Sequence, residues 1–199
     1  LPLLLPDNNI WETMAIYKKL AEARAALAEL KGRLPVIPNP LMLINTLVLQ
    51  EAKDSSTIEN IFTTNDELYK AFSSSSPNVN PSTKEVLRYR EALWSAFAKL
   101  KSPTSYSVGL AVEIFKTITG KDEGIRTVQV YIGSSNSVVY TPPEHGNILM
   151  NKLNNWFDTA LNNNSIDPLI KMAMLHYQFE AIHPFTDGNG RTGRILNVL

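Results

Sequence analysis

Residues 183–194 read HPFTDGNGRTGR, and the interpretation of the whole chain starts from this stretch. Gly188 and Gly190 can adopt backbone angles that other residues resist, so a turn between them can aim successive N–H groups at one anion. A helix that begins here adds the positive end of its dipole. Gly188, Asn189 and Gly190 are therefore predicted to bind phosphate oxygens.

The charged side chains of the same stretch supply the other parts of a site for phosphate chemistry. Arg191 and Arg194 stand three positions apart, so both can grip phosphate oxygens from the start of a helix. Asp187 offers the oxygen ligand that Mg²⁺ takes when it bridges phosphates. His183, with an ordinary pKa of about 6.5, can act as a general base. Taken alone, the stretch also fits an Asx-type turn between two helices.

The composition narrows the class of protein. The 199 residues fit one domain and carry 19 basic and 19 acidic side chains, so the formal net charge is +0 and favours neither nucleic acid nor an anionic membrane. The absence of cysteine excludes disulfides and thiolate zinc sites. No run approaches the roughly 20 apolar residues of a membrane span. We expect no membrane association and a soluble, cytoplasmic protein.

Apolar residues recur at helical spacing through most of the chain, which predicts a mainly α fold. The segment 12–30 is expected to be an amphipathic helix that packs through Ile16, Leu20, Ala23, Leu27 and Leu30. Further helices are predicted over 41–53, 61–72, 82–100, 108–118, 144–161 and 170–182. The serine- and proline-rich segment 73–81 is the predicted boundary between an N-terminal helical region, residues 1–80, and a core, residues 81–199.

Two β-prone runs, 127–132 and 138–140, interrupt the helical pattern. The residues between them, Gly-Ser-Ser-Asn-Ser, favour a turn. We therefore predict a β-hairpin that forms a solvent-facing flap. Earlier in the chain, residues 54–60 read DSSTIEN, and spacing alone favours a capped helix end there.

Both polar stretches resemble motifs of the Fic family. Residues 183–194 match the family signature His-Pro-Phe-x-(Asp/Glu)-Gly-Asn-Gly-Arg-x-x-Arg at every specified position. Ser55, Glu59 and Asn60 match its inhibitory motif (Ser/Thr)-x-x-x-Glu-(Gly/Asn), and their place before the core resembles the class with an N-terminal inhibitory helix, class II. The resemblance implies a Fic-type helical fold with a small β-hairpin flap. It also implies that Glu59 pairs with Arg194 where the γ-phosphate of ATP would lie.

The resemblance further implies a protein adenylyltransferase, which uses ATP and Mg²⁺ to place AMP on a Ser, Thr or Tyr hydroxyl of a target protein, with self-modification as a further outcome. His183 would take the hydroxyl proton, and Asp187 would hold Mg²⁺. ATP would bind Gly188, Asn189, Gly190, Arg191 and Arg194. In the family a hairpin at this place aligns the target by strand addition, which makes Ser137, Val138, Val139 and Tyr140 the expected docking edge.

Two other functions stay open at this point. The same site would remove AMP from a modified protein if Glu59 orients a water molecule. Alternatively, the chain is a nucleotide-binding partner module that Glu59 keeps occluded. A phosphotransferase of the Doc branch fits less well, because the Gly-Asn-Gly sequence is retained. Since the chain stops shortly after Arg194, we expect a fragment that lacks adenine-binding residues, and nucleic acid as a partner only if a missing C-terminal domain binds it.

Overall fold

The computed structural model describes residues 2–4, 8–73, 79–134, 137–162 and 165–199. Its first helices are α1 (Asn8–Trp11), α2 (Met14–Arg33), the 3₁₀ turn η1 (Leu34–Val36), α3 (Pro40–Ile58) and α4 (Asn65–Ser73). They are followed by α5 (Pro81–Lys99), the 3₁₀ turn η2 (Pro103–Ser105), α6 (Val108–Thr119), strands β1 (Ile132–Ser134) and β2 (Ser137–Tyr140), α7 (Asn147–Asn162), α8 (Pro168–Ile182) and α9 (Asn189–Val198). The fold is mainly α with one small antiparallel hairpin, which confirms the predicted class.

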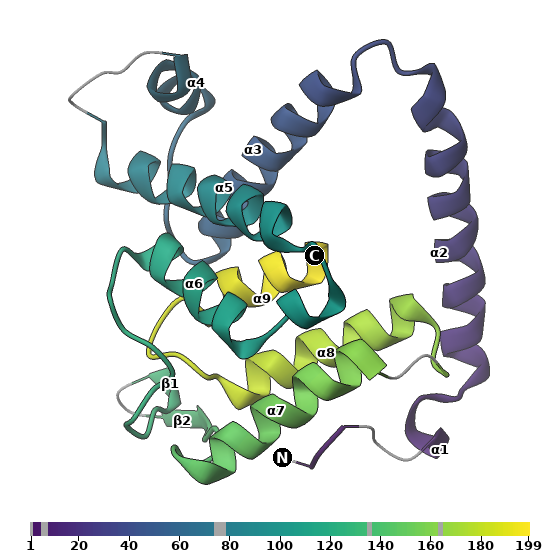
Figure 1. Ribbon diagram of the computed structural model, residues 1–199, viewed down its shortest axis with the longest axis vertical. Coiled ribbons are helices and arrows are strands. Elements are labelled where there is room, and N and C mark those ends of the chain that lie inside the picture. The colour runs from purple at the N-terminus through teal and green to yellow at the C-terminus, as the bar shows by residue number, and fades with distance from the viewer. Residues whose placement is uncertain (1, 5–7, 74–78, 135–136, 163–164) are drawn as a thin grey trace.

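One hydrophobic core joins the helices that surround α9 (Figure 1). Helix α5 packs against α3 and α6, and α8 lies between α7 and α9. The aromatic rings at the centre are fully buried, namely Tyr89, Phe115, Trp156, Phe179 and Phe185. The short helix α9, which begins inside the predicted phosphate loop, therefore stands on a rigid base formed by α6 and α8.

Helix α2 forms as predicted, but only the N-terminal part of its predicted apolar face is packed. In Figure 1 its C-terminal half stands away from the other helices, whereas its N-terminal half lies beside the start of α8, where Arg24 pairs with Asp167. None of the residues of α2 is buried. Leu27 and Leu30 are 53% and 56% exposed, while Ile16 and Leu20 are half-buried beside Trp11. The apolar spacing identified the helix correctly, because that spacing reflects the helical period. It does not state which element covers the apolar face.

The hairpin is shorter than predicted on one side. Strand β2 starts at Ser137, but β1 begins only at Ile132 and not at residue 127. The reason is that side chains occupy the backbone carbonyls ahead of it: Arg126 bonds to the Val128 carbonyl, and Gln129 bonds to that of Val130. Residues 135–136 of the connecting turn, and residues 74–78 of the predicted boundary, lie outside the described residues.

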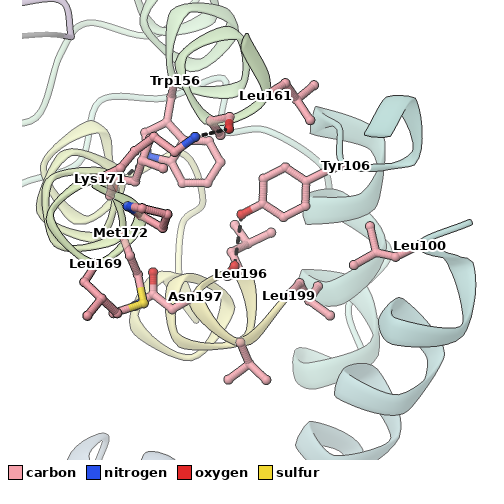
Figure 2. Close-up of a pocket in the computed structure, with 14 residues that line it drawn as sticks. Leu100, Tyr106, Trp156, Leu161, Leu169, Lys171, Met172, Leu196, Asn197 and Leu199 are labelled. Atoms are coloured by element: carbon pink, nitrogen blue, oxygen red, sulfur yellow. Dashed lines mark hydrogen bonds between the residues drawn. The ribbon is translucent and has the colours of Figure 1, made fainter. Parts of the chain in front are cut away.

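A pocket of about 510 Å³ opens between α7, α8 and the last turn of α9 (Figure 2). Tyr106 donates a hydrogen bond to the Leu196 carbonyl at 3.0 Å, and Trp156 donates one to the Leu175 carbonyl at 2.7 Å. No residue of 183–194 lines this pocket, so it is separate from the predicted phosphate loop. Among the described helices, none combines the length and apolar character that crossing a bilayer requires.

Candidate active site

The loop between α8 and α9 is bounded by two residues in the left-handed region. His183, which caps α8, has φ 50°, and Gly188, which caps α9, has φ 66°. Gly188 adopts this angle freely, whereas a residue with a Cβ loses about 1–2 kcal/mol there. The conformation of His183 therefore needs support from its surroundings.

Part of this support comes from within the loop. Phe185 is completely buried and stacks on Phe115 with ring centroids 4.4 Å apart. The Asn189 amide closes the loop, since it accepts a hydrogen bond from the Phe185 N–H and donates one to the Phe185 carbonyl, both at 2.9 Å. The Asn189 side chain is thus used inside the loop, and only its backbone N–H is left to meet a ligand.

The imidazole of His183 is placed as a neutral base. Its Nδ1 lies 3.3 Å from the Glu180 carbonyl, so we assign the proton to Nδ1 and the free lone pair to Nε2. Burial lowers the pKa of His183, and the positive charge of Arg126 lowers it further. The bond to Glu180 and the charges of Glu59 and Asp187 act in the opposite direction without reversing the shift. The ring therefore stays unprotonated at neutral pH.

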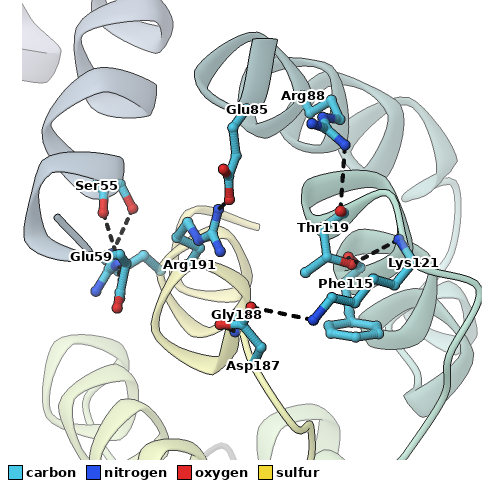
Figure 3. Close-up of polar contacts among 11 residues, drawn as sticks. Ser55, Glu59, Glu85, Arg88, Phe115, Thr119, Lys121, Asp187, Gly188 and Arg191 are labelled. Carbon is cyan, nitrogen blue, oxygen red and sulfur yellow. Dashed lines mark hydrogen bonds and ion pairs between the residues drawn. The ribbon is translucent and has the colours of Figure 1, made fainter. Parts of the chain in front are cut away.

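The structure brings Arg194 together with the predicted inhibitory residues. Arg194 Nε donates to Ser55 Oγ at 2.6 Å, and Nη2 donates to the Ser55 carbonyl at 3.0 Å. The same Nη2 donates to Glu59 Oε1 at 2.7 Å. Ser55 is 2% exposed, whereas the Glu59 side chain is 36% exposed. Ser55 thus fixes the guanidinium of Arg194 from its buried side, and Glu59 binds it on the more exposed side. Figure 3 shows Ser55 and Glu59 at the end of α3, beside α9.

The Glu59 carboxylate also lies on the first turn of α9. A Cβ added at Gly190 would overlap Glu59 Oε1, so the absence of a side chain at Gly190 is what admits the carboxylate. The first N–H groups of a helix have no partner within it and carry the positive end of the dipole. The place beside Gly190 and Arg194 is therefore an anion site, which Glu59 occupies.

Asn60 ends the helix that carries Glu59. It follows α3 with φ 61°, its N–H donates to the Thr57 carbonyl, and the N–H of Ile61 donates to the Ser56 carbonyl. This is the Schellman arrangement, in which the residue after the helix cap must be left-handed. Glycine and asparagine tolerate that conformation best, which explains why an inhibitory motif would accept these two residues after the glutamate.

Arg191 has a different ion-pair partner from Arg194. Its side chain is 3% exposed and forms an ion pair with Glu85 of α5 (Figure 3). The two arginines of α9 therefore meet different elements, Arg191 pairing with α5 and Arg194 with the end of α3, and Arg191 Nη2 also lies close to Gly188. The sequence did not mark Glu85 as a functional residue, because no motif surrounds it and its partner lies 106 positions later.

Asp187 projects from the loop toward solvent. Its Oδ1 accepts a hydrogen bond from the Gly188 N–H at 2.7 Å, and its Oδ2 lies 3.6 Å from the Lys121 ammonium (Figure 3). No group of three or more metal-binding side chains occurs in the described part of the chain. A single exposed carboxylate fits Mg²⁺, which commonly takes one or two protein carboxylates and completes its shell with water and phosphate oxygens.

Comparison with known proteins agrees with this geometry. The Fic/DOC family N-terminal model matches residues 17–98, and the Fic/DOC family model matches residues 105–199. The chain belongs to the Fic/DOC family. The protein adenylyltransferase fic-1 of Caenorhabditis elegans is 43% identical over 74 residues, which cover 36% of this chain and 13% of that protein. The protein adenylyltransferase Fic of Drosophila willistoni is 30% identical over 119 residues, which cover 56% of this chain and 23% of that protein.

The fold of this Fic chain is also similar to solved Fic structures. A Fic family protein from Desulfovibrio desulfuricans superposes with a TM-score of 0.74 at 23% identity, over 100% of this chain and 59% of that one. C. elegans Fic-1 superposes with a TM-score of 0.66 at 24% identity, over 92% of this chain and 58% of that one. The chain therefore spans between 13% and 23% of the curated relatives described above and somewhat more than half of these solved chains.

The hairpin of this Fic chain is tied to the end of α8. Tyr140 donates its hydroxyl hydrogen to the Ala181 carbonyl at 3.0 Å, two residues before His183. Val138 and Val139 are 57% and 79% exposed. The only strand paired with β2 in the described chain is β1, so one edge of β2 is available for strand addition. The predicted docking residues thus lie on a strand edge that has no partner strand in the described chain. Tyr140 connects this edge to the end of α8 and so to residues 183–188, the loop between α8 and α9 that we call the Fic loop.

Sequence reasoning missed Arg126, which precedes the hairpin and is 3% exposed. Its guanidinium donates to the carbonyls of His183, Val128 and Pro143. Its backbone N–H donates to the Pro184 carbonyl at 2.9 Å. Nothing in the spacing of the sequence marks this residue, because all four of its partners are backbone carbonyls.

Proposed function

We propose that this chain is an autoinhibited protein adenylyltransferase that transfers AMP from ATP to a Ser, Thr or Tyr hydroxyl of a target protein. The observation that carries the proposal is the position of the Glu59 carboxylate between Arg194 and the N-terminus of α9. A carboxylate held there stands in for a phosphate oxygen. The neutral imidazole of His183 begins the loop that leads into the same helix. An anion site beside a general base is what nucleotidyl transfer needs.

In the proposed reaction His183 Nε2 accepts the proton of the target hydroxyl, and the hydroxyl oxygen attacks the α-phosphorus of ATP. The bond from that phosphorus to the bridging oxygen breaks, and pyrophosphate leaves with the electron pair. Backbone N–H groups of Asn189 and Gly190 stabilise the negative charge on the phosphates, and that of Gly188 joins them once Asp187, which accepts its hydrogen bond in this structure, turns to Mg²⁺. Arg194 binds the outer phosphates once Glu59 is displaced.

Arg191 contributes to the same site from beneath it. Its guanidinium is buried and paired with Glu85. While this ion pair is intact, Arg191 attracts the phosphates electrostatically from behind the first turn of α9. It could contact a phosphate oxygen directly only if the ion pair opened. Asp187 would hold Mg²⁺, which when bound neutralises charge on the phosphates. Asp187 must then leave Lys121, and a 3.6 Å contact between half-exposed groups is weak enough to permit this.

In this proposal, inhibition and catalysis belong to different regions of the chain. Residues 1–80 carry the inhibitory Ser55, Glu59 and Asn60, and residues 81–199 carry the catalytic loop. The target is a protein, the chain itself included, whose extended segment pairs with the edge formed by Ser137, Val138, Val139 and Tyr140. Cytoplasmic location and the absence of nucleic acid from the core reaction belong to the same proposal.

The test uses ATP labelled at the α-phosphate with Mg²⁺ and a cell extract as a source of targets. Glu59→Gly is expected to label protein strongly, whereas wild type labels weakly and Glu59→Gly/His183→Ala does not label at all. Asp54→Ala is the matched control, since Asp54 is a carboxylate of α3 that contacts Gln50 and not Arg194. If Glu59→Gly and wild type label equally, Glu59 is not inhibitory. If Glu59→Gly labels nothing, the transferase proposal is wrong.

The reverse reaction, removal of AMP, is a second candidate because the Glu59 carboxylate is held on the first turn of α9, directly after the loop that carries His183. A carboxylate near the base can orient an attacking water. Incubation of a labelled target with wild type and with Glu59→Gly separates the two reactions, because only the reverse reaction needs the carboxylate. Release of AMP by wild type alone would make removal the main activity.

A further inference from the structure

Arg126 connects the two segments that flank the hairpin with His183, the first residue of the Fic loop. Its Nε donates to the His183 carbonyl at 2.8 Å, and its Nη1 donates to the Val128 carbonyl at 3.0 Å. Its Nη2 donates to the Pro143 carbonyl, on the far side of the hairpin. One guanidinium therefore holds both ends of the hairpin and the carbonyl of the general base.

The backbone of Arg126 reinforces this connection. Its N–H donates to the Pro184 carbonyl at 2.9 Å, so two successive carbonyls at the start of the loop are bound to one residue. His183 is the residue with φ 50°, whose conformation needs external support. The bonds to the carbonyls of His183 and Pro184 fix the peptide planes on either side of Pro184, and with them the direction in which the imidazole leaves the chain.

We propose that Arg126 is a positioning residue, which sets the general base His183 in register with a target segment paired to the hairpin edge. The inference rests on the proposed function, because it concerns the same reaction. Tyr140 supplies a second connection through the Ala181 carbonyl. Arg126 and Tyr140 together make the hairpin and the end of α8 move as one body.

The charge of Arg126 gives the same residue a second effect on the base. Four influences besides it act on the imidazole: burial, the Glu180 carbonyl, and the carboxylates of Glu59 and Asp187. Burial and Arg126 lower the pKa of His183, and the others raise it. Arg126 therefore also helps to keep the base unprotonated, although it does not touch the reacting atoms.

Arginine suits this role better than lysine. Its planar fork presents donors in fixed directions and can serve three carbonyls at once, whereas a single ammonium on a flexible stem cannot span the same three. Arg126→Lys thus retains the charge and loses the geometry, and Arg126→Gln loses both. The two variants separate positioning from charge.

The first experiment follows the His183 imidazole by NMR titration in the Glu59→Gly protein without ATP. Arg126→Gln is expected to raise the pKa of His183, and Arg126→Lys is expected to leave it lowered. Arg88→Gln is the control, because Arg88 donates one long bond, 3.4 Å, to the Thr119 carbonyl and none to the Fic loop. An unchanged pKa in Arg126→Gln would overturn the electrostatic part. This measurement needs no transfer activity, so it fails independently of the proposed function.

The second experiment measures AMP transfer to a protein target. Both Arg126 variants are expected to lose about tenfold or more in kcat/KM for the target, since small misplacements of reacting groups are costly. KM for ATP should change less than about twofold. Tyr140→Phe should raise KM for the target without raising the pKa of His183. An equal loss for ATP and target, or full activity in Arg126→Lys, would overturn the positioning role.

Hydrogen exchange keeps the inference testable if a variant folds poorly or the target is unknown. Arg126→Lys and Tyr140→Phe should each speed exchange at residues 137–140 and 183–186, relative to the rest of the chain. Exchange that rises evenly over all helices would indicate general destabilisation and overturn the proposal. Exchange that rises only at these two segments would support it.

Discussion

Glu59 and Arg194 are joined by a hydrogen bond of 2.7 Å that spans 135 positions of the sequence. The pair is partly open to solvent, with side-chain exposures of 36% and 20%, so its net strength is modest. Ser55 holds the same guanidinium through two other bonds that do not involve Glu59. Removal of Glu59 therefore leaves Arg194 in place and opens its outer side.

ATP affinity should reflect this arrangement. Release of a partly exposed pair of about 1 kcal/mol corresponds to roughly a fivefold change in Kd. Glu59→Gly is thus expected to lower Kd for ATP about fivefold in calorimetric titration. Adding Ser55→Ala to that variant should weaken binding again, because the guanidinium loses the Oγ acceptor that orients its Nε.

Asp54→Ala serves as the control for this titration, since it removes another carboxylate of the same helix. Its Kd for ATP should equal that of wild type. If Glu59→Gly binds ATP no better than wild type, the carboxylate does not compete with a phosphate, and the anion site beside Gly190 is not the nucleotide site.

Asn60 should control inhibition through the backbone. Asn60→Val places a β-branched residue at φ 61° and is expected to destabilise the fold by about 1–2 kcal/mol. The last turn of α3 then frays, Glu59 leaves Arg194, and AMP transfer rises. Asn60→Gly tolerates the same angle and should match wild type in both respects. Urea unfolding and the labelling assay measure the two effects, and equal behaviour of the two variants would contradict the argument.

The ion pair between Arg191 and Glu85 should be structural. Glu85→Ala leaves a guanidinium that is 3% exposed without its carboxylate. Loss of one partner of a fully buried pair typically costs about 3–5 kcal/mol, and because Glu85 itself is 28% exposed we expect a loss near the lower end of that range. Denaturant unfolding should show a loss of this order. The double variant Glu85→Leu/Arg191→Met should recover most of it, because neither charge remains buried.

An exposed pair provides the comparison. Lys99 and Glu113 form an ion pair with side-chain exposures of 53% and 55%, so Glu113→Ala should cost less than about 1 kcal/mol. Similar losses for Glu85→Ala and Glu113→Ala would show that burial does not strengthen the Arg191 pair.

The features that could be predicted from the sequence are those formed by residues that lie close together in the chain. Residues 183–188 form the loop between α8 and α9 and residues 189–194 open α9, as the glycines and the change of pattern indicated, and the left-handed conformation of Gly188 agrees with its residue type. Arg126 and Glu85 were not predictable, because each acts on a partner 57 or 106 positions away through contacts that only the fold creates. The exposure of α2 was missed for the same reason: periodicity gives the helix but not its neighbour.

Glu180 should make the stability of the fold depend on pH. Its Oε1 is buried and has no hydrogen-bond partner among the described residues, and burial raises its pKa to about 7. Arg194 lowers this pKa and Glu59 raises it, but both effects are smaller than that of burial. In the unfolded chain the carboxyl titrates near its ordinary value of 4.5. The penalty for burying the charge is therefore absent below pH 4.5, grows as pH rises, and is complete above pH 7.

Replacement of this carboxylate should consequently stabilise the protein only at high pH. Glu180→Gln is expected to raise the free energy of unfolding, relative to wild type, by on the order of 1–3 kcal/mol more at pH 8 than at pH 4.5. The comparison between the two pH values removes the effect of burying the glutamine amide, which is the same at both. Glu12→Gln, at an exposed position before α2, should show no such difference. Urea unfolding at the two pH values gives the result, and an equal effect of Glu180→Gln at both would mean that folding does not raise the pKa of Glu180.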